Sequence, residues 1–410
     1  MDQSFIDVMY LNACGAKGVQ PEARDYDFKE IFRLSINQGV WRTVFLAVKS
    51  LHENDLLEID RKDYQALKKL FQSQIVREMQ RYTLVHKLLD EFESNQIKGC
   101  ILKGEAIARY YNVPESRESS DIDIFIPKEK EKRSVAILKK NGFTIQKREY
   151  GSHHFRAMHP VAGLLEIHTS MYGKRTNDIC FNNSITYEEA YVEFEGVGGE
   201  SSLKTLGVTD TMIFLLMHFI KHFLLEGITI KHLNDILLYT EKEFDKISWD
   251  KVNQVIDYLK FDTLFSYMID IGKRYMEFPN FLFHHENRKI NVNIEEQLLS
   301  DMYHGGQWGK QAEREGFYDL YLEKRYNRFH EGDYTGYQKK EKIKGGVGRL
   351  FPNRRFMSVN FKYIKKCPYL LPLAWIHRIL HVALGKQKTQ SDLSQEITER
   401  MKLVDDLGMI

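Results

Sequence analysis

The feature that most constrains the fold is the run DIDIFI at residues 121–126, in which two aspartates alternate with large apolar residues. This alternation, together with the β-branched isoleucines, predicts a β-strand with Asp121 and Asp123 on one face and the isoleucines on the other. An ionised carboxylate that is buried without a partner costs several kcal/mol. The face that carries the two aspartates must therefore meet water, a cation or a protein partner.

The two aspartates suit a divalent metal ion. Positions two apart on a strand place the carboxylates of Asp121 and Asp123 about 5 to 7 Å apart, where they repel each other unless a cation lies between them. Mg²⁺ and Mn²⁺ prefer oxygen ligands of this kind. The alternative is a solvent-exposed edge strand without a ligand, which so short a motif does not exclude.

Upstream of this run, a lysine and a glycine form a candidate phosphate-binding turn. Lys103 and Gly104 end a predicted strand over 97–102 and precede a predicted helix over 105–111. A glycine in that place lets the backbone approach a phosphate closely. The Lys103 ammonium and the N–H groups at the start of the helix add positive charge.

Downstream, a third acid lies in the run LLEIH at 164–168. Its alternation predicts a strand with Glu166 and His168 on one face and its apolar residues in the core. If this strand lies beside the strand at 121–126, three carboxylates converge. Such a group of acids is the outline of a two-metal site for phosphoryl transfer.

The chain as a whole has the pattern of an α+β protein. We expect a small mixed β-sheet core over 96–200, helical regions over 1–95 and 201–335, and a basic aromatic segment with C-terminal helices over 336–410. Apolar residues recur every three or four positions over 64–92, which predicts one long helix. Further strands are expected over 143–150, 153–158 and 163–169, and further helices over 128–140, 209–225 and 230–240.

Composition narrows the class of protein. The formal net charge of +2 favours neither nucleic acid nor membrane as a partner of the whole molecule. The four cysteines form no CxxC pair, and no HExxH or Cys/His spacing is present, so neither a disulfide framework nor a zinc site is predicted. No apolar stretch reaches the roughly 18 residues of a membrane span. We expect a cytoplasmic protein with reduced cysteines and no transmembrane segment.

A local basic region lies near the C-terminus. Residues 342–388 contain eleven Lys or Arg, interleaved with aromatic residues, and no Asp or Glu. This composition favours RNA, another anionic polymer or an anionic membrane surface as a partner. The alternative is that the aromatic side chains pack onto the helical region while the basic groups stay in solvent.

Several segments together resemble a known family: ILKGEAIARYY, DIDIFI, LLEIHTSMY, MHFIKH and IKHLNDILLYT. Their order is similar to that in the nucleotidyltransferase superfamily that includes DNA polymerase beta. More closely, the segments resemble a bacterial family of uncharacterised nucleotidyltransferases, which shares features with abortive-infection nucleotidyltransferase toxins. The resemblance covers about residues 80–245 and a C-terminal segment at 368–378, while the first 80 residues have no match.

The resemblance implies a site for nucleotidyl transfer. Asp121 and Asp123 would bind the Mg²⁺ or Mn²⁺ ions that bridge the nucleotide triphosphate. Glu166 would ligate the metal beside the acceptor hydroxyl and help to deprotonate it. Lys103 and Gly104 would lie along the β and γ phosphates.

The resemblance also implies roles for three residues outside this group. Arg117 would neutralise charge on the leaving pyrophosphate. In the helical region, Lys231 would contact the nucleotide and Asp235 would support it; the alternative is an exposed helix face with an ion pair between these two residues. The implied reaction transfers a nucleoside monophosphate from an NTP to a hydroxyl acceptor. The family's frequent association with surface-polysaccharide genes favours a sugar or glycan-linked acceptor.

One position departs from the superfamily pattern. Gly104 is followed by Glu105, where most members have a second glycine or a serine, and the loop from Glu105 to Asp121 is longer than in many relatives. An anion thus replaces a small phosphate-binding residue, unless Glu105 points outward along its helix. This departure favours a first alternative, a non-catalytic scaffold with the same fold. A second alternative is a toxin-like nucleotidyltransferase that acts on RNA through 342–388.

Overall fold

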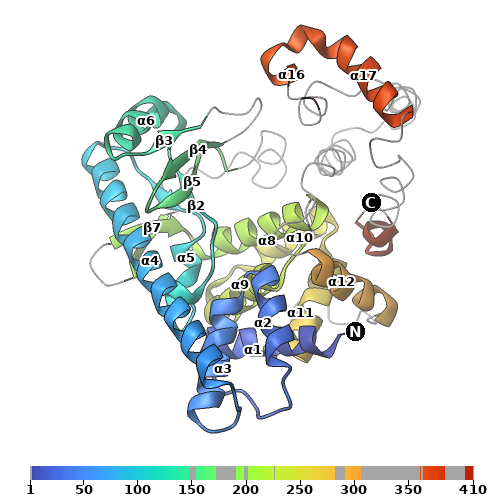
Figure 1. Ribbon diagram of the computed structural model, residues 1–410. Helices are drawn as coiled ribbons and strands as arrows, with labels where there is room; N and C mark the ends of the chain where they lie inside the picture. The colour runs from blue at the N-terminus through green and yellow to red at the C-terminus, as the bar shows by residue number, and fades with distance from the viewer. Residues whose placement is uncertain are drawn as a thin grey trace. The chain divides into compact units, whose positions relative to one another are not determined.

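The computed structural model describes residues 2–146, 154–171, 191–197, 202–225, 227–281, 291–305, 361, 363–383 and 402–409. The chain divides into two compact units, Met1–Gly309 and Lys310–Ile410. The first unit contains the helices and strands that form the candidate site (Figure 1).

The N-terminal region is helical, as expected. It consists of α1 (Gln3–Lys17), α2 (Phe28–Gln38), α3 (Trp41–Glu53) and α4 (Arg61–Ser94). Three of these helices begin after an aspartate, Asp2, Asp27 or Asp60, whose carboxylate accepts a backbone N–H of the first turn. The predicted long helix is confirmed as α4, which extends from the N-terminal helices to the β-sheet (Figure 1).

A seven-stranded mixed sheet forms the centre of the first unit, and this confirms the α+β class. Its strands lie in the order β3-β4-β5-β2-β1-β7-β6. Two neighbouring pairs, β2 with β5 and β1 with β7, are parallel, and the others are antiparallel. The bounds are β1 (Cys100–Ile101), β2 (Asp121–Phe125), β3 (Thr144–Ile145), β4 (His154–His159), β5 (Gly163–His168), β6 (Tyr191–Glu195) and β7 (Ser202–Leu206).

The sheet differs from the expected one in two ways. Strand β1 is two residues long, and the part of the expected strand at 143–150 that follows residue 146 lies outside the described residues. Strands β6 and β7, which had not been expected, add to the sheet beside β1, with β6 at the edge. They pair with each other in an antiparallel register, from Tyr191 with Leu206 to Glu195 with Ser202.

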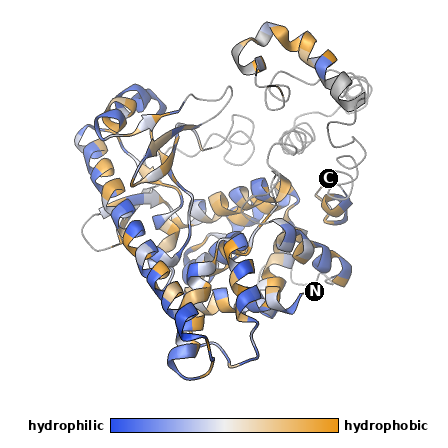
Figure 2. Ribbon diagram, in the orientation of Figure 1, coloured by the Kyte–Doolittle hydropathy of each residue, from blue (hydrophilic) through white to orange (hydrophobic). Residues whose placement is uncertain are grey.

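One face of α4 packs against the sheet. Val85, Leu89 and Phe92 of α4 share a buried cluster with Ile124 of β2 and Ile167 of β5. Most of α4 is nevertheless hydrophilic in Figure 2, since only this face is covered. Burial of the isoleucines on one side of β2 and β5 turns the acidic residues of both strands to the other side.

The other helices confirm the expected helical region. Short α5 (Glu105–Ala108) follows β1, and α6 (Glu131–Lys140) follows β2. After β7 come α8 (Val208–Leu225), α9 (Ile230–Glu243), α10 (Trp249–Leu259), α11 (Asp262–Met276) and α12 (Val292–Gly305). Helix α9, which carries Lys231 and Asp235, packs against α8.

The second unit is described only in part. Helices α16 (Tyr363–Lys366) and α17 (Leu371–Ala383) enclose a small core of Phe361, Ile364 and Ala374. Most of the basic segment at 342–388 lies outside the described residues, so its predicted role stays a prediction. Among the residues that the structure describes, no helix combines the length and apolar character needed to span a membrane.

The close packing of α1 and α3 predicts a stability effect. A Cβ added at Gly15 would lie 1.9 Å from the carbonyl oxygen of Thr43, a backbone atom of α3, so the two helices would have to separate. We expect Gly15→Ala to lower the free energy of unfolding by about 1–3 kcal/mol, measured by urea denaturation. Gly99→Ala is the control, because the added Cβ meets a leucine side chain at 3.2 Å instead of backbone. An unchanged midpoint for Gly15→Ala would contradict this account.

Candidate functional site

The pairing of β2 with β5 brings three carboxylates together. In the parallel register, Asp123 lies opposite Glu166, and Asp121 lies opposite Leu164. One carboxylate oxygen from each of Asp121, Asp123 and Glu166 lies within 4.8 Å of the other two. The sequence predicts that the three carboxylates converge if the two strands are neighbours. In the structure the strands are neighbours and the carboxylates lie together.

An arginine from α4 supports this register. Nε of Arg81 donates to the carbonyl of Ala162, just before β5, at 2.9 Å, and Nη1 donates to the carbonyl of Ser119, just before β2, at 2.8 Å. Arg81 thus ties the starts of the two acid-bearing strands to one helix. Because its guanidinium is a rigid fork, it fixes the two starts relative to each other.

A buried lysine lies against the carboxylates. Lys103, which follows β1, has its Nζ 3.2 Å from Oδ2 of Asp123 and 3.9 Å from Oδ1 of Asp121. Burial opposes the charged form of Lys103, but the charges of Asp121 and Asp123 outweigh it and raise the pKa of Lys103. Burial likewise opposes the ionised form of Asp123, yet Lys103 and a hydrogen bond from His168 hold its pKa well below the usual range. At neutral pH this is a buried ion pair.

Gly104 has a backbone conformation that favours glycine. Its φ is 77° and its ψ is −117°, and it precedes the first residue of α5. An added Cβ would meet nothing nearer than the side chain of Ile122 at 3.8 Å, so a larger residue would fit in the space. Glycine is favoured here because of the positive φ. Gly104 therefore turns the chain sharply between Lys103 and α5, as the predicted phosphate-binding turn requires.

Glu105 lies neither in the carboxylate group nor on the outer surface. It is 1% exposed, and both of its oxygens contact Nε2 of His86 on α4, at 2.7 and 2.9 Å. Its Oε1 also accepts the backbone N–H of Val197. The alternative in which Glu105 points outward along its helix is therefore wrong, because α5 is buried and Glu105 joins α4 to Val197, just after β6.

Histidines and an arginine surround the acids. Nε2 of His168 is 3.0 Å from Oδ1 of Asp123, and Nε of Arg156 donates to Oε1 of Glu166 at 2.8 Å. His154 lies 3.6 Å from the same oxygen of Glu166. Burial, followed by the positive charges of its neighbours, lowers the pKa of His154 to about 3, so it is neutral at pH 7. Sequence reasoning did not single out Arg156, since its position opposite Glu166 depends on the β4–β5 register.

Arg117 and Asp235 form a buried bidentate ion pair. Nε and Nη2 of Arg117 donate to the two oxygens of Asp235 at 2.8 and 2.6 Å, and Tyr111 donates to Oδ1 at 2.7 Å. Arg117 is 2% exposed. Asp235 therefore pairs with Arg117 and not with Lys231, and Arg117 contacts α9 where the expectation was a contact with pyrophosphate.

Lys231 is half-buried near the carboxylates. Within the part of the chain that the structure describes, its ammonium group forms no hydrogen bond or ion pair. Burial, followed by the charges of Arg117 and Lys103, lowers the pKa of Lys231 to about 8. Such a lysine is available for an anionic ligand. The charges of Asp235 and Asp121 favour its protonated form, but they do not restore its pKa to the usual value.

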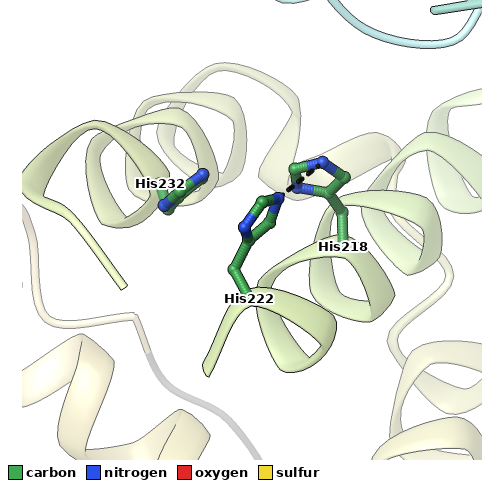
Figure 3. Close-up of side chains that lie close together, drawn as sticks. All are labelled: His218, His222 and His232. Carbon is green, nitrogen blue, oxygen red and sulfur yellow. Dashed lines mark hydrogen bonds between the residues drawn. The ribbon is translucent and has the colours of Figure 1, made fainter. Parts of the chain in front are cut away.

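Three histidines of α8 and α9 lie close together, and one of them contacts Lys103. They are His218, His222 and His232, and their side chains gather in Figure 3. Nζ of Lys103 is 3.0 Å from Nε2 of His218, whose Nε2 is also 3.1 Å from Nε2 of His222. Burial, together with nearby positive charges, lowers the pKa of both His218 and His232 well below the usual value.

The donor set of the acidic group fits Mg²⁺ or Mn²⁺. It consists of carboxylate oxygens, which hard divalent cations prefer. Oδ2 of Asp123 is buried and accepts no hydrogen bond of good geometry within the described residues, and the Lys103 ammonium lies 3.2 Å from it. A buried oxygen of this kind is suited to a metal ligand.

Comparison with known proteins gives a family and two distant structures. The family model described as uncharacterised nucleotidyltransferase matches residues 24–277. The solution structure of the antibiotic-resistance factor ANT(2'')-Ia is 17% identical, with 45% of this chain and 92% of that chain covered and a TM-score of 0.32. A crystal structure of an antigenic nucleotidyltransferase-like protein from Paracoccidioides brasiliensis is 15% identical, with 39% and 75% covered and a TM-score of 0.28. No curated protein matches the chain.

The matched range contains β1, β2, β5 and α9, and hence every residue of the candidate site described above. It also spans more than half of the chain. The chain belongs to the family of uncharacterised nucleotidyltransferases.

Proposed function

We propose that this protein transfers a nucleoside monophosphate from an NTP to a hydroxyl group of an acceptor, with release of pyrophosphate. The observation that carries the proposal is the β2–β5 register, which gathers Asp121, Asp123 and Glu166 beside two lysines. A sugar or glycan-linked hydroxyl is the acceptor class to test first. The family membership supports the reaction class.

Asp121, Asp123 and Glu166 would hold the divalent cation. Their oxygens lie within 4.8 Å of one another, and they are the type of ligand that Mg²⁺ and Mn²⁺ prefer. When bound, the cation supplies positive charge for the phosphate oxygens and lowers the pKa of a hydroxyl group beside it. The neighbouring lysines add to this positive charge.

The protein side chains supply binding and proton transfer. Lys103 and Lys231 bind the phosphates: Lys103 reaches the site from the residues after β1, and Lys231 lies on α9 with no ion-pair partner among the described residues. Glu166 accepts the proton of the acceptor hydroxyl, while Arg156 orients its carboxylate through the 2.8 Å bond to Oε1. Enzymes that catalyse in-line phosphoryl transfer depend mainly on the positioning of the reacting groups and on electrostatic stabilisation, and less on covalent catalysis.

Arg117 acts as a positioning residue in this proposal. Its bidentate bond to Asp235 holds α9 against the chain that leads into β2, so Lys231 keeps its place relative to Asp121. The backbone turn at Gly104 likewise fixes Lys103 relative to α5. Both contacts restrict where a triphosphate can lie.

Loss of the acids should abolish transfer. We expect Asp123→Asn and Glu166→Gln to lower kcat by more than about a hundredfold, because each loses several kcal/mol of transition-state charge stabilisation. The measurement is transfer of label from each α-labelled NTP to a panel of acceptors that includes sugars and tRNA. Asp90→Asn, which changes an exposed aspartate of α4, is the matched control.

Two outcomes of the labelling experiment would count against the proposal. Equal labelling by the wild type and Asp123→Asn would show that the acidic group is not the catalytic site. Failure of the wild type to bind any NTP in the presence of Mn²⁺, measured by calorimetry, would favour the non-catalytic scaffold instead.

The pKa of Lys231 predicts a pH dependence of nucleotide binding. Its ammonium form, which attracts phosphate, prevails below its pKa of about 8 and is lost as the pH rises above that value. We expect the affinity for a non-hydrolysable NTP to fall above pH 8, by up to about tenfold per pH unit. In Lys231→Arg the guanidinium stays charged, so the affinity should stay level over the same range. Identical profiles for the two proteins would contradict a phosphate contact by Lys231.

The contacts of Glu105 predict a structural role for this residue. We expect Glu105→Ala to lower the free energy of unfolding by about 1–3 kcal/mol, because His86 and the N–H of Val197 lose their acceptor. The KM for the NTP should change little. His86→Ala and the double variant complete a cycle that measures the coupling between the two side chains. A large gain in NTP affinity for Glu105→Ala would instead mean that its charge opposes the triphosphate.

A further inference from the structure

A cluster of three histidines, His218, His222 and His232, lies next to the proposed nucleotide site but has no role in it. His218 and His222 are four residues apart on α8, so they share one face of that helix, and His232 lies in the first turn of α9. Figure 3 shows the three side chains gathered in the space between the two helices. One ring nitrogen from each lies within 4.8 Å of the other two.

We propose that this histidine cluster binds a Zn²⁺ ion. Three histidine nitrogens are a known type of protein ligand set for zinc, and a set of three leaves a fourth coordination position for water or a substrate group. Imidazole also distinguishes this cluster from the carboxylate group, whose oxygens suit Mg²⁺. The inference does not depend on the proposed function.

The distances suit zinc after a small adjustment. Zn–N bonds of about 2.0–2.1 Å in a tetrahedral site place the nitrogens about 3.3 Å apart. Nε2 of His218 and Nε2 of His222 are 3.1 Å apart. The other separations, at most 4.8 Å, need to shorten by no more than about 1.5 Å, which half-buried side chains can do by rotating about χ1 and χ2.

The hydrogen bonds of His218 direct a lone pair into the cluster. The Lys103 ammonium can only donate, so Nε2 of His218 is the acceptor in their 3.0 Å contact, and His222 donates to the same atom. Zinc would take the place of these donors at His218. Lys103 would keep Asp123 as its partner, 3.2 Å away, so its charge would not be left alone.

The ring of His232 is held at the first turn of α9. Its Nδ1 accepts the backbone N–H of Thr229 at 3.3 Å and lies 3.0 Å from the hydroxyl oxygen of the same residue. Zinc at Nε2 requires the tautomer with the proton on Nδ1, so the bond from the backbone N–H would be exchanged for donation from Nδ1 to the hydroxyl oxygen. Such a bond orients the ring and increases the basicity of the bound nitrogen.

The spacing of these histidines explains why sequence reasoning predicted no zinc site. His218 and His222, four residues apart, look in the sequence like two polar residues on an exposed helix face. His232 lies on a separate helix. Only the packing of α8 against α9 brings His232 to the other two.

The test is the binding of Zn²⁺, and of Co²⁺ as its spectroscopic substitute, to the whole chain. We expect one equivalent of Zn²⁺ to bind in calorimetry, and Co²⁺ to give the visible absorption of a four-coordinate ion with nitrogen ligands. His222→Gln and His232→Gln should each weaken Zn²⁺ binding by more than about tenfold and remove the Co²⁺ absorption. Circular dichroism and thermal unfolding establish that both variants are folded.

Two further variants separate this cluster from other sites. His304→Gln, which removes an exposed imidazole of α12, should bind Zn²⁺ like the wild type. His154→Gln tests the second group, His154, Glu166 and His168, whose ligand atoms also lie within 4.8 Å of one another. Zn²⁺ binding that survives in folded His222→Gln and His232→Gln, or that disappears in His154→Gln instead, would overturn the proposal. Absence of Zn²⁺ binding to the wild type would do the same.

Discussion

The buried ion pair between Arg117 and Asp235 is the contact on which the arrangement of the site depends. It joins the loop before β2 to α9, across 118 positions of the chain, with both oxygens of Asp235 engaged. Removal of one partner of a buried pair commonly costs about 3–5 kcal/mol, because the other charge remains without compensation. Tyr111 adds a third bond to the same carboxylate. The helix that carries Lys231 and His232 is thereby held over the strands that carry the acids.

The acidic group depends in turn on a second long-range constraint, the parallel register of β2 and β5. A shift of one residue would move Glu166 away from Asp123 and turn it toward the core. Arg81 opposes such a shift, because it binds the carbonyls that precede both strands. The buried isoleucines oppose it as well, since each would have to leave the core beneath α4. Packing on one face of the sheet thus sets the chemistry on the other face.

Periodicity in the sequence predicts the parts of the site that are local. The alternation over 121–126 and 164–168 places the acids of each strand on one face, and the structure has them there. The helical repeat over 64–92 predicts α4 in the same way. A single sequence contains no signal for contacts between distant segments, such as Glu105 with His86, Arg156 with Glu166 or Arg117 with Asp235. These contacts depend on sheet order and helix packing, which are decided by the whole core.

The place of Lys103 has a consequence for how ligands enter. This lysine is itself a cation of the acidic group, and its charge offsets the repulsion between the carboxylates of Asp121 and Asp123. In the proposed function, entry of a divalent ion would therefore be an exchange, in which the ammonium group gives up Asp123. A triphosphate offers the displaced ammonium group a new anionic partner. Metal and nucleotide should accordingly bind with positive cooperativity, each strengthening the binding of the other by the same factor.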